Sequence, residues 1–118
     1  MTGPHLCVDV AASYGNMAVV RAIQGHYEEA DRLFEEGHNI EMKVYGYHHP
    51  TTAKFHVNKA WISIKAGNER ECREHLSCAL ETGFLWIAVP FLKTEETFEA
   101  LQNTAWFQDL LQNAEKRH

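Results

Sequence analysis

The chain has 118 residues, and its 11 Lys and Arg against 16 Asp and Glu give a formal net charge of −5 at pH 7. This length is enough for one domain with a single core, whereas the acidic balance argues against nucleic-acid binding, which needs clustered basic residues. No apolar run reaches the roughly 20 residues of a membrane span, and no signal-peptide pattern opens the chain, so we predict a cytoplasmic protein without a membrane segment.

Two predicted helices come first and form a hairpin over about residues 8–45. Apolar residues recur at helical spacing in two stretches, namely Val10, Tyr14, Met17 and Ala18, and then Tyr27, Ala30, Phe34, Gly37, Ile40 and Val44. Gly25 falls between the stretches, where a helix that ends in the left-handed conformation favours a residue without a Cβ. The small Ala18 and Ala30 allow the two helix backbones to approach closely.

The pattern of this hairpin returns, weakened, over about residues 50–83. Gly67 lies 42 residues after Gly25 (67 − 25), and the same offset relates Asn16 to Asn58 and Ala18 to Ala60. It also relates Glu29 to Glu71 and, conservatively, Val20 to Ile62, Ala30 to Cys72 and Phe34 to Leu76. One hairpin cannot bury its own apolar stripe and must stack on the next copy. We therefore predict an all-α solenoid of antiparallel helical hairpins.

The residues of the first copy resemble the tetratricopeptide repeat (TPR), in the long-repeat variety typified by kinesin light chain. The resemblance covers about residues 9–83, and the second copy is degenerate at His56, Lys59 and Glu69. It rests on Asp9-Val10-Ala11, Asn16-Met17-Ala18, Gly25-x-Tyr27-Glu28-Glu29-Ala30 and Val44-Tyr45-Gly46-Tyr47-His48-His49-Pro50. Gly3-Pro4-x-x-x-x-Asp9-Val10 resembles the loop that joins one such repeat to the next, so we expect the chain to be the end of a longer array.

The repeat pattern stops after Gly83, and we predict a helical cap over about residues 84–118. Phe84 to Leu92 is apolar and contains Pro90, which leaves room for a short helix or a turn. Thr94 is predicted to cap a short helix whose apolar side carries Phe98 and Leu101. Thr104 is predicted to cap a last helix with Trp106, Phe107, Leu110 and Leu111 on its apolar face.

The sequence contains no pattern typical of catalysis or metal binding. Eight histidines are present, densest at His48, His49 and His56, but no His-Glu-x-x-His element or comparable ligand spacing occurs. Cys7, Cys72 and Cys78 are an odd set that does not indicate a disulfide framework, and no nucleophile motif appears. We expect no enzyme activity, metal or cofactor. We expect His56 to lie between helices, so that its protonation destabilises the second repeat.

Because catalysis and metal binding are not indicated, the remaining class of function is the binding of a protein or peptide. The resemblance implies a concave groove lined by the first helix of each repeat. It places Asn16 and Asn58 at equivalent positions where this family often holds a peptide main chain. The alternative is that these asparagines are inherited repeat residues without a ligand. Trp61 is either an exposed anchor or a core residue. The full set implied is Ala12, Gly15, Asn16 and Val19 from the first repeat and Lys54, Val57, Asn58, Trp61 and Lys65 from the second.

We therefore predict a protein–protein interaction module, a scaffold or adaptor that binds a peptide or partner segment in this groove. Lys54 and Lys65 would suit an acidic peptide. The alternative function is structural: the segment caps a longer array, or forms a homodimer through its open N-terminal edge, and has no peptide ligand. An exposed apolar stripe on the helix from Val8 to Val19 would favour this alternative.

Overall fold

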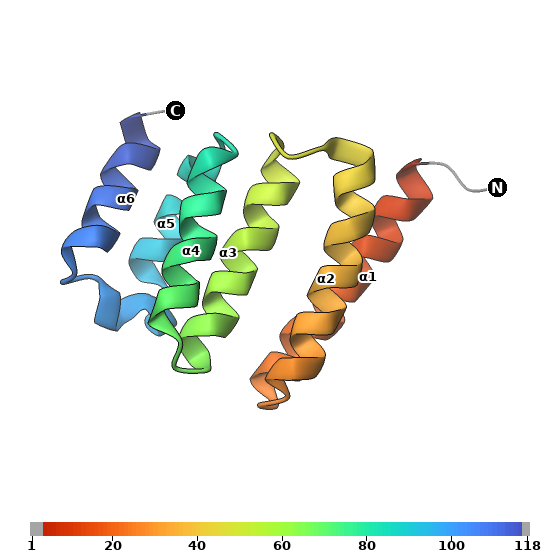
Figure 1. Ribbon diagram of the computed structural model, residues 1–118, viewed down its shortest axis with the longest axis horizontal. Helices are drawn as coiled ribbons and strands as arrows, with labels where there is room; N and C mark the ends of the chain where they lie inside the picture. The colour runs from red at the N-terminus through yellow and green to blue at the C-terminus, as the bar shows by residue number, and fades with distance from the viewer. Residues whose placement is uncertain (1–3, 117–118) are drawn as a thin grey trace. The chain divides into compact units, whose positions relative to one another are not determined.

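The computed structural model describes the backbone of residues 4–116 and the side chains of residues 10–116. Every regular element in this part of the chain is helical (Figure 1). In order they are α1 (Pro4–Ile23), α2 (Tyr27–Tyr45), α3 (Pro50–Lys65), α4 (Glu69–Glu81), the 3-10 helix η1 (Leu85–Ala88), α5 (Val89–Thr94), the 3-10 helix η2 (Glu96–Leu101) and α6 (Ala105–Lys116). The all-α fold class is thus confirmed, whereas Met1 to Pro4 and Cys7 fall wholly or partly outside the described residues.

The chain forms two compact units, with the division between Tyr47 and His48. Unit 1 contains the antiparallel pair α1 and α2, and unit 2 contains the antiparallel pair α3 and α4 together with η1, α5, η2 and α6 (Figure 1). The division falls between the two hairpins that the sequence predicts. The predicted cap belongs to unit 2.

In unit 1, small residues bring α1 and α2 together. Ala11, Ala18 and Ala22 form the buried face of α1. On α2, a Cβ added at the buried Gly37 would lie 3.1 Å from the carbonyl oxygen of Ala11 and 3.2 Å from the Cβ of Tyr14. The backbones are therefore so close that a side chain at this position of α2 would push against the backbone of α1.

The larger apolar residues of α1 lie on a different face from these alanines. Val10, Met17 and Val20 are 44%, 48% and 49% exposed, and Ile23 is more exposed still. The predicted apolar stripe of α1 is therefore split, because the contact with α2 accepts only small side chains. The exposed face is the stripe that a single hairpin leaves unburied.

In unit 2, the cap shares one core with the α3–α4 hairpin. Phe98 of η2 is fully buried, and its ring stacks on that of Phe107 of α6, with 6.2 Å between the centroids. The same core contains Ala60 of α3 and Cys72 and Leu76 of α4, together with Leu85, Leu92, Leu101, Leu110, Leu111 and Ala114 of the cap. Two helices of a hairpin alone could not enclose these side chains, so the cap completes the core.

Residues that are 42 positions apart in the two hairpins have the same backbone conformation or the same burial at most of the related positions. Gly25 and Gly67 end their helices with φ of 86° and 84°, a conformation that favours glycine. Ala18 and Ala60 are both fully buried, and so are Ala30 and Cys72, while Phe34 and Leu76 are both buried. Val20 differs from its equivalent Ile62, which is only 2% exposed.

One of the two predicted capping residues of the C-terminal segment differs from expectation. Thr94 is the last residue of α5 and not an N-cap, because its hydroxyl donates to the carbonyl oxygen of Pro90 at 2.7 Å. The short helix that follows is the 3-10 helix η2, and it buries Phe98 and Leu101 as predicted. Thr104 directly precedes α6 and its carbonyl oxygen accepts the hydrogen bond from Gln108 N, while its hydroxyl donates to the carbonyl oxygen of Leu101.

Candidate functional site

A groove of about 420 Å³ opens on the surface of unit 2. The N-terminal half of α3 forms one wall, and the segment from Phe84 through η1 to α5 forms the other. The lining is mostly apolar and consists of Pro50, Thr51, Ala53, Lys54, Val57, Asn58, Phe84, Ile87, Ala88 and Phe91. A groove of this size and composition has the properties of a typical binding site.

The α3 wall carries three of the residues that the sequence singles out. Lys54, Val57 and Asn58 lie at i, i+3 and i+4, and so share one face of the helix. Val57 is buried, Asn58 is half-buried and Lys54 is exposed. Within the described residues, neither the Asn58 amide nor the Lys54 ammonium group has a hydrogen bond or ion pair, so both are open to a ligand.

The opposite wall was not foreseen as part of a site. Ile87 and Phe91 project two exposed apolar side chains, 51% and 42% accessible. The Phe91 ring meets the buried Phe98 edge-on at 6.0 Å, which holds it in place. The apolar run from Phe84 to Leu92 is the signal in the sequence for this wall, but the run alone does not reveal which of its side chains remain exposed.

Trp61 and Lys65 lie further along α3 and form a polar cluster with the start of η2. The indole Nε1 of Trp61 donates to Glu95 Oε1 at 3.4 Å, and Lys65 Nζ lies 4.9 Å from the centre of the Trp61 ring. The hydrogen bond from the Thr97 hydroxyl is the largest effect that holds the pKa of Glu95 below its usual value. Burial opposes it as the second-largest effect, and weaker contributions from Trp61, the Thr97 backbone and the charge of Lys65 also lower this pKa. Trp61 is half-buried and packs partly against the core.

The residues predicted from the first repeat lie in unit 1. Asn16 is exposed and has no hydrogen bond to any described residue, and Val19 is half-buried. A shallow hollow of about 270 Å³ is lined by Asn16, Met17, Val20 and Arg21. Each asparagine is thus accessible within its own unit, and a shared groove for Asn16 and Asn58 remains a prediction.

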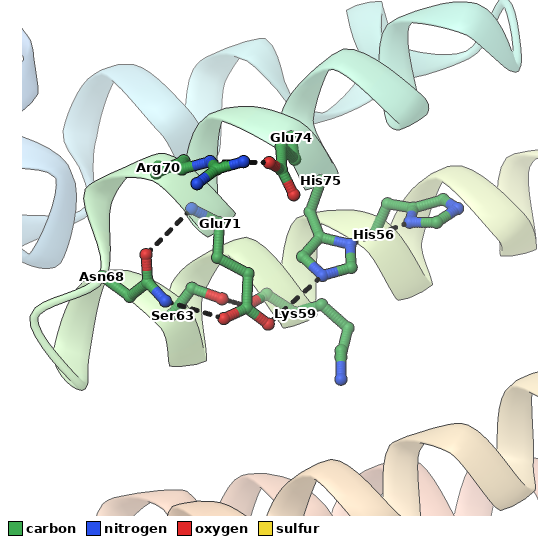
Figure 2. A network of polar contacts seen from close by, with 8 residues as sticks. All are labelled: His56, Lys59, Ser63, Asn68, Arg70, Glu71, Glu74 and His75. Atoms are coloured by element: carbon green, nitrogen blue, oxygen red, sulfur yellow. Dashed lines mark hydrogen bonds and ion pairs between the residues drawn. The ribbon is translucent and has the colours of Figure 1, made fainter.

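His56 lies between α3 and α4, as expected for a histidine that takes a core position (Figure 2). Its Nδ1 is 3.3 Å from Nδ1 of His75, and the rings stack with centroids 5.6 Å apart. His75 Nε2 is 3.8 Å from Glu71 Oε1, and Glu71 accepts a hydrogen bond from the Asn68 amide. The nitrogen contact needs one protonated and one unprotonated Nδ1, because two donors cannot bond to each other.

This contact predicts that unit 2 loses stability at acidic pH. Free histidine takes up a proton near pH 6.5, and the Glu71 carboxylate favours a charge on His75, but a second charge would face the first at 3.3 Å. The unfolded chain then binds more protons than the native pair, so stability falls as the pH falls. We expect unfolding at pH 5 to need roughly 1 kcal/mol less than at pH 7.5.

Urea unfolding followed by tryptophan emission measures this effect in unit 2, because Trp61, Trp86 and Trp106 all lie in that unit. His56→Gln should remove much of the pH dependence, whereas His26→Gln, at an exposed position, should keep it. Equal stability of the wild type at the two pH values would contradict the interpretation of the histidine pair.

Catalytic and metal chemistry find no support in the described part of the chain. Burial, assisted by the nearby Glu69 carboxylate, raises the pKa of the Cys72 thiol to about 12, which is the opposite of what a thiolate nucleophile needs. The pKa of Cys78 is raised too, again mainly by burial. No group of three or more potential metal ligands occurs among the residues whose positions are described, and none of their helices is long and apolar enough to cross a bilayer.

Comparison with known protein families gives a match over both hairpins. A family model described as tetratricopeptide repeat matches residues 9–82, which span both hairpins. No curated protein and no solved structure matches. The match ends at the last residues of the second hairpin, before the segment that forms the second wall of the groove.

Proposed function

Because the chain belongs to the tetratricopeptide repeat family, whose members are generally non-catalytic protein-interaction modules, we propose that it binds a peptide segment of a partner protein in the groove of unit 2. In this role it is a scaffold or adaptor. The observation that carries the proposal is a groove already formed, with an apolar lining and with the Asn58 amide at its edge, where this amide has no hydrogen bond to any residue that the structure describes.

An amide at this place suits a peptide main chain, because it donates and accepts at once and so matches a peptide unit. The groove walls need little rearrangement to receive a ligand. Val57 is packed in the core of unit 2, and Phe91 is held against Phe98. A preformed surface of this kind loses little conformational entropy on binding.

Selection from a random peptide-display library, with the whole protein as bait, tests the proposal. Selected peptides should bind the wild type, and Asn58→Ala should weaken them about tenfold, because the loss of a hydrogen bond to a buried peptide group costs about 1–1.5 kcal/mol. Asn113→Ala, at an exposed position of α6, is the matched control and should have no effect. Failure to select any peptide, or equal loss in both variants, would refute the groove as the binding site.

The exposed face of α1 supports a second candidate, self-association of the chain through its N-terminal hairpin. The positions 42 residues after Val10, Met17 and Val20 are Thr52, Lys59 and Ile62, and all three are buried. The repeat pattern thus ordinarily covers this face, and here it is open and apolar. A second copy of the chain could cover it.

Light scattering distinguishes this candidate from the first. Self-association predicts a dimer that Val20→Glu dissociates, whereas Glu28→Gln, at an exposed position of α2, leaves it intact. A wild type that stays monomeric at high concentration would contradict the candidate.

A further inference from the structure

The polarity and charge of the groove of unit 2 change along its length. Its apolar part lies between Val57 and the Ile87–Phe91 wall, and Lys54 is the one charged residue among those that line it. Towards the C-terminal end of α3, Lys65 lies over the Trp61 ring, and its charge contributes weakly to the lowered pKa of Glu95. A ligand in the groove therefore meets the charge of Lys54, which has no ion pair with any described residue.

The helix dipole adds to this charge. Lys54 lies in the second turn of α3, and Pro50 and Thr51 from the first turn also line the groove. The N-terminal turn of a helix carries partial positive charge and favours anions. The contribution of the dipole is small, because His49 already accepts hydrogen bonds from the N–H groups of Thr51, Thr52 and Ala53, so Lys54 is the main source of positive potential beside the apolar surface.

The apolar part restricts the side chain that it accepts. Its lining residues offer hydrogen-bond acceptors only at Thr51 and Asn58, apart from backbone groups already used within helices. An indole N–H or a phenol O–H buried there would have no assured partner, and an unpaired buried donor costs free energy. A side chain without polar atoms, such as Leu, Ile, Met or Phe, avoids this cost.

We propose that this groove selects peptides in which a bulky side chain without polar atoms inserts between α3 and the Ile87–Phe91 wall while a neighbouring carboxylate pairs with Lys54. The inference rests on the proposed peptide-binding function and specifies its ligand. One wall comes from the segment after the matched repeats, so the preference belongs to this chain's cap and not to the repeat pattern alone.

Short capped peptides with one Leu and one Asp in a Gly and Ser background provide the test, with methyl and amide chemical shifts of the whole protein as the readout. The Leu/Asp peptide should shift the Val57 and Ile87 methyl resonances in a saturable way. Replacing its Leu by Ser should abolish the shifts, and replacing its Leu by Trp should weaken binding. Replacing its Asp by Asn should weaken binding about fivefold at low salt, and this difference should shrink at high salt.

Lys54→Gln separates the charge effect from general loss of binding. In this variant the Asp and Asn peptides should bind with equal affinity. In the control Lys116→Gln, at an exposed position of α6, the Asp peptide should still bind more tightly than the Asn peptide. Equal binding of the Asp and Asn peptides to the wild type, or tighter binding of the Trp peptide, would overturn the inference. If display-selected peptides still bind and depend on Asn58, only this ligand preference fails; if no peptide binds in either experiment, the proposed function fails with it.

Discussion

Phe98→Ala is expected to lower the free energy of unfolding of unit 2 by about 3–5 kcal/mol, the range for removal of a buried phenylalanine ring. Phe98 is fully buried, stacks on Phe107 and supports Phe91. Its loss would open a cavity where η2 meets α5 and α6. Since marginal domains have a total stability of only about 5–15 kcal/mol, the variant is expected to be largely unfolded at moderate urea concentration.

Tryptophan emission measures this transition without interference from the N-terminal hairpin, because Trp61, Trp86 and Trp106 all lie in unit 2. Phe91→Ala is the control, since its ring is 42% exposed and its removal should cost much less. If Phe98→Ala left the urea midpoint unchanged, the cap would not share a core with the α3–α4 hairpin.

Gly37→Ala is expected to destabilise unit 1 by about 1–3 kcal/mol, the usual cost of overpacking. At an ordinary helix position this change would stabilise by about 1 kcal/mol, because alanine is the better helix former. Here the added methyl group would lie 3.1 Å from the Ala11 carbonyl oxygen and 3.2 Å from the Tyr14 Cβ, and neither atom can move without shifting α1.

Gly15→Ala gives the opposite expectation in the same hairpin. Gly15 lies within α1, and an added Cβ there meets no atom within 4 Å. The Gly15→Ala substitution should therefore stabilise the hairpin. Amide hydrogen exchange in α1 and α2 measures both variants, and a stabilising Gly37→Ala would show that the two helices can separate at no cost.

Much of the fold could be predicted from the sequence because the repeat pattern is carried by residues with strict local requirements. Gly25 and Gly67 stand where a positive φ is needed, and Ala18 and Ala60 stand where backbones meet. The turns, the two hairpins and the burial of His56 follow from such positions. The 42-residue offset predicts Val20 and Ile62 to be equivalent but cannot predict their different exposure, which depends on what surrounds each helix.

The capping segment was less predictable, because hydroxyl side chains have several competing partners. Thr94 looks like an N-cap, yet it is the last residue of α5 and its hydroxyl donates to a carbonyl group of the preceding turn. The α3 side of the groove was predicted from the repeat register, which places Lys54, Val57 and Asn58 on one face. The other wall was missed because an apolar run with a proline does not reveal which side chains remain exposed.

Chemical-shift mapping with a display-selected peptide tests the central claim most directly. If the groove of unit 2 is the binding surface, the changes should concentrate at Lys54, Val57 and Asn58 on one wall and at Ile87 and Phe91 on the other. Changes confined to Val10, Met17, Val20 and Ile23 of α1, with the groove resonances unmoved, would contradict the claim and favour self-association through the N-terminal hairpin.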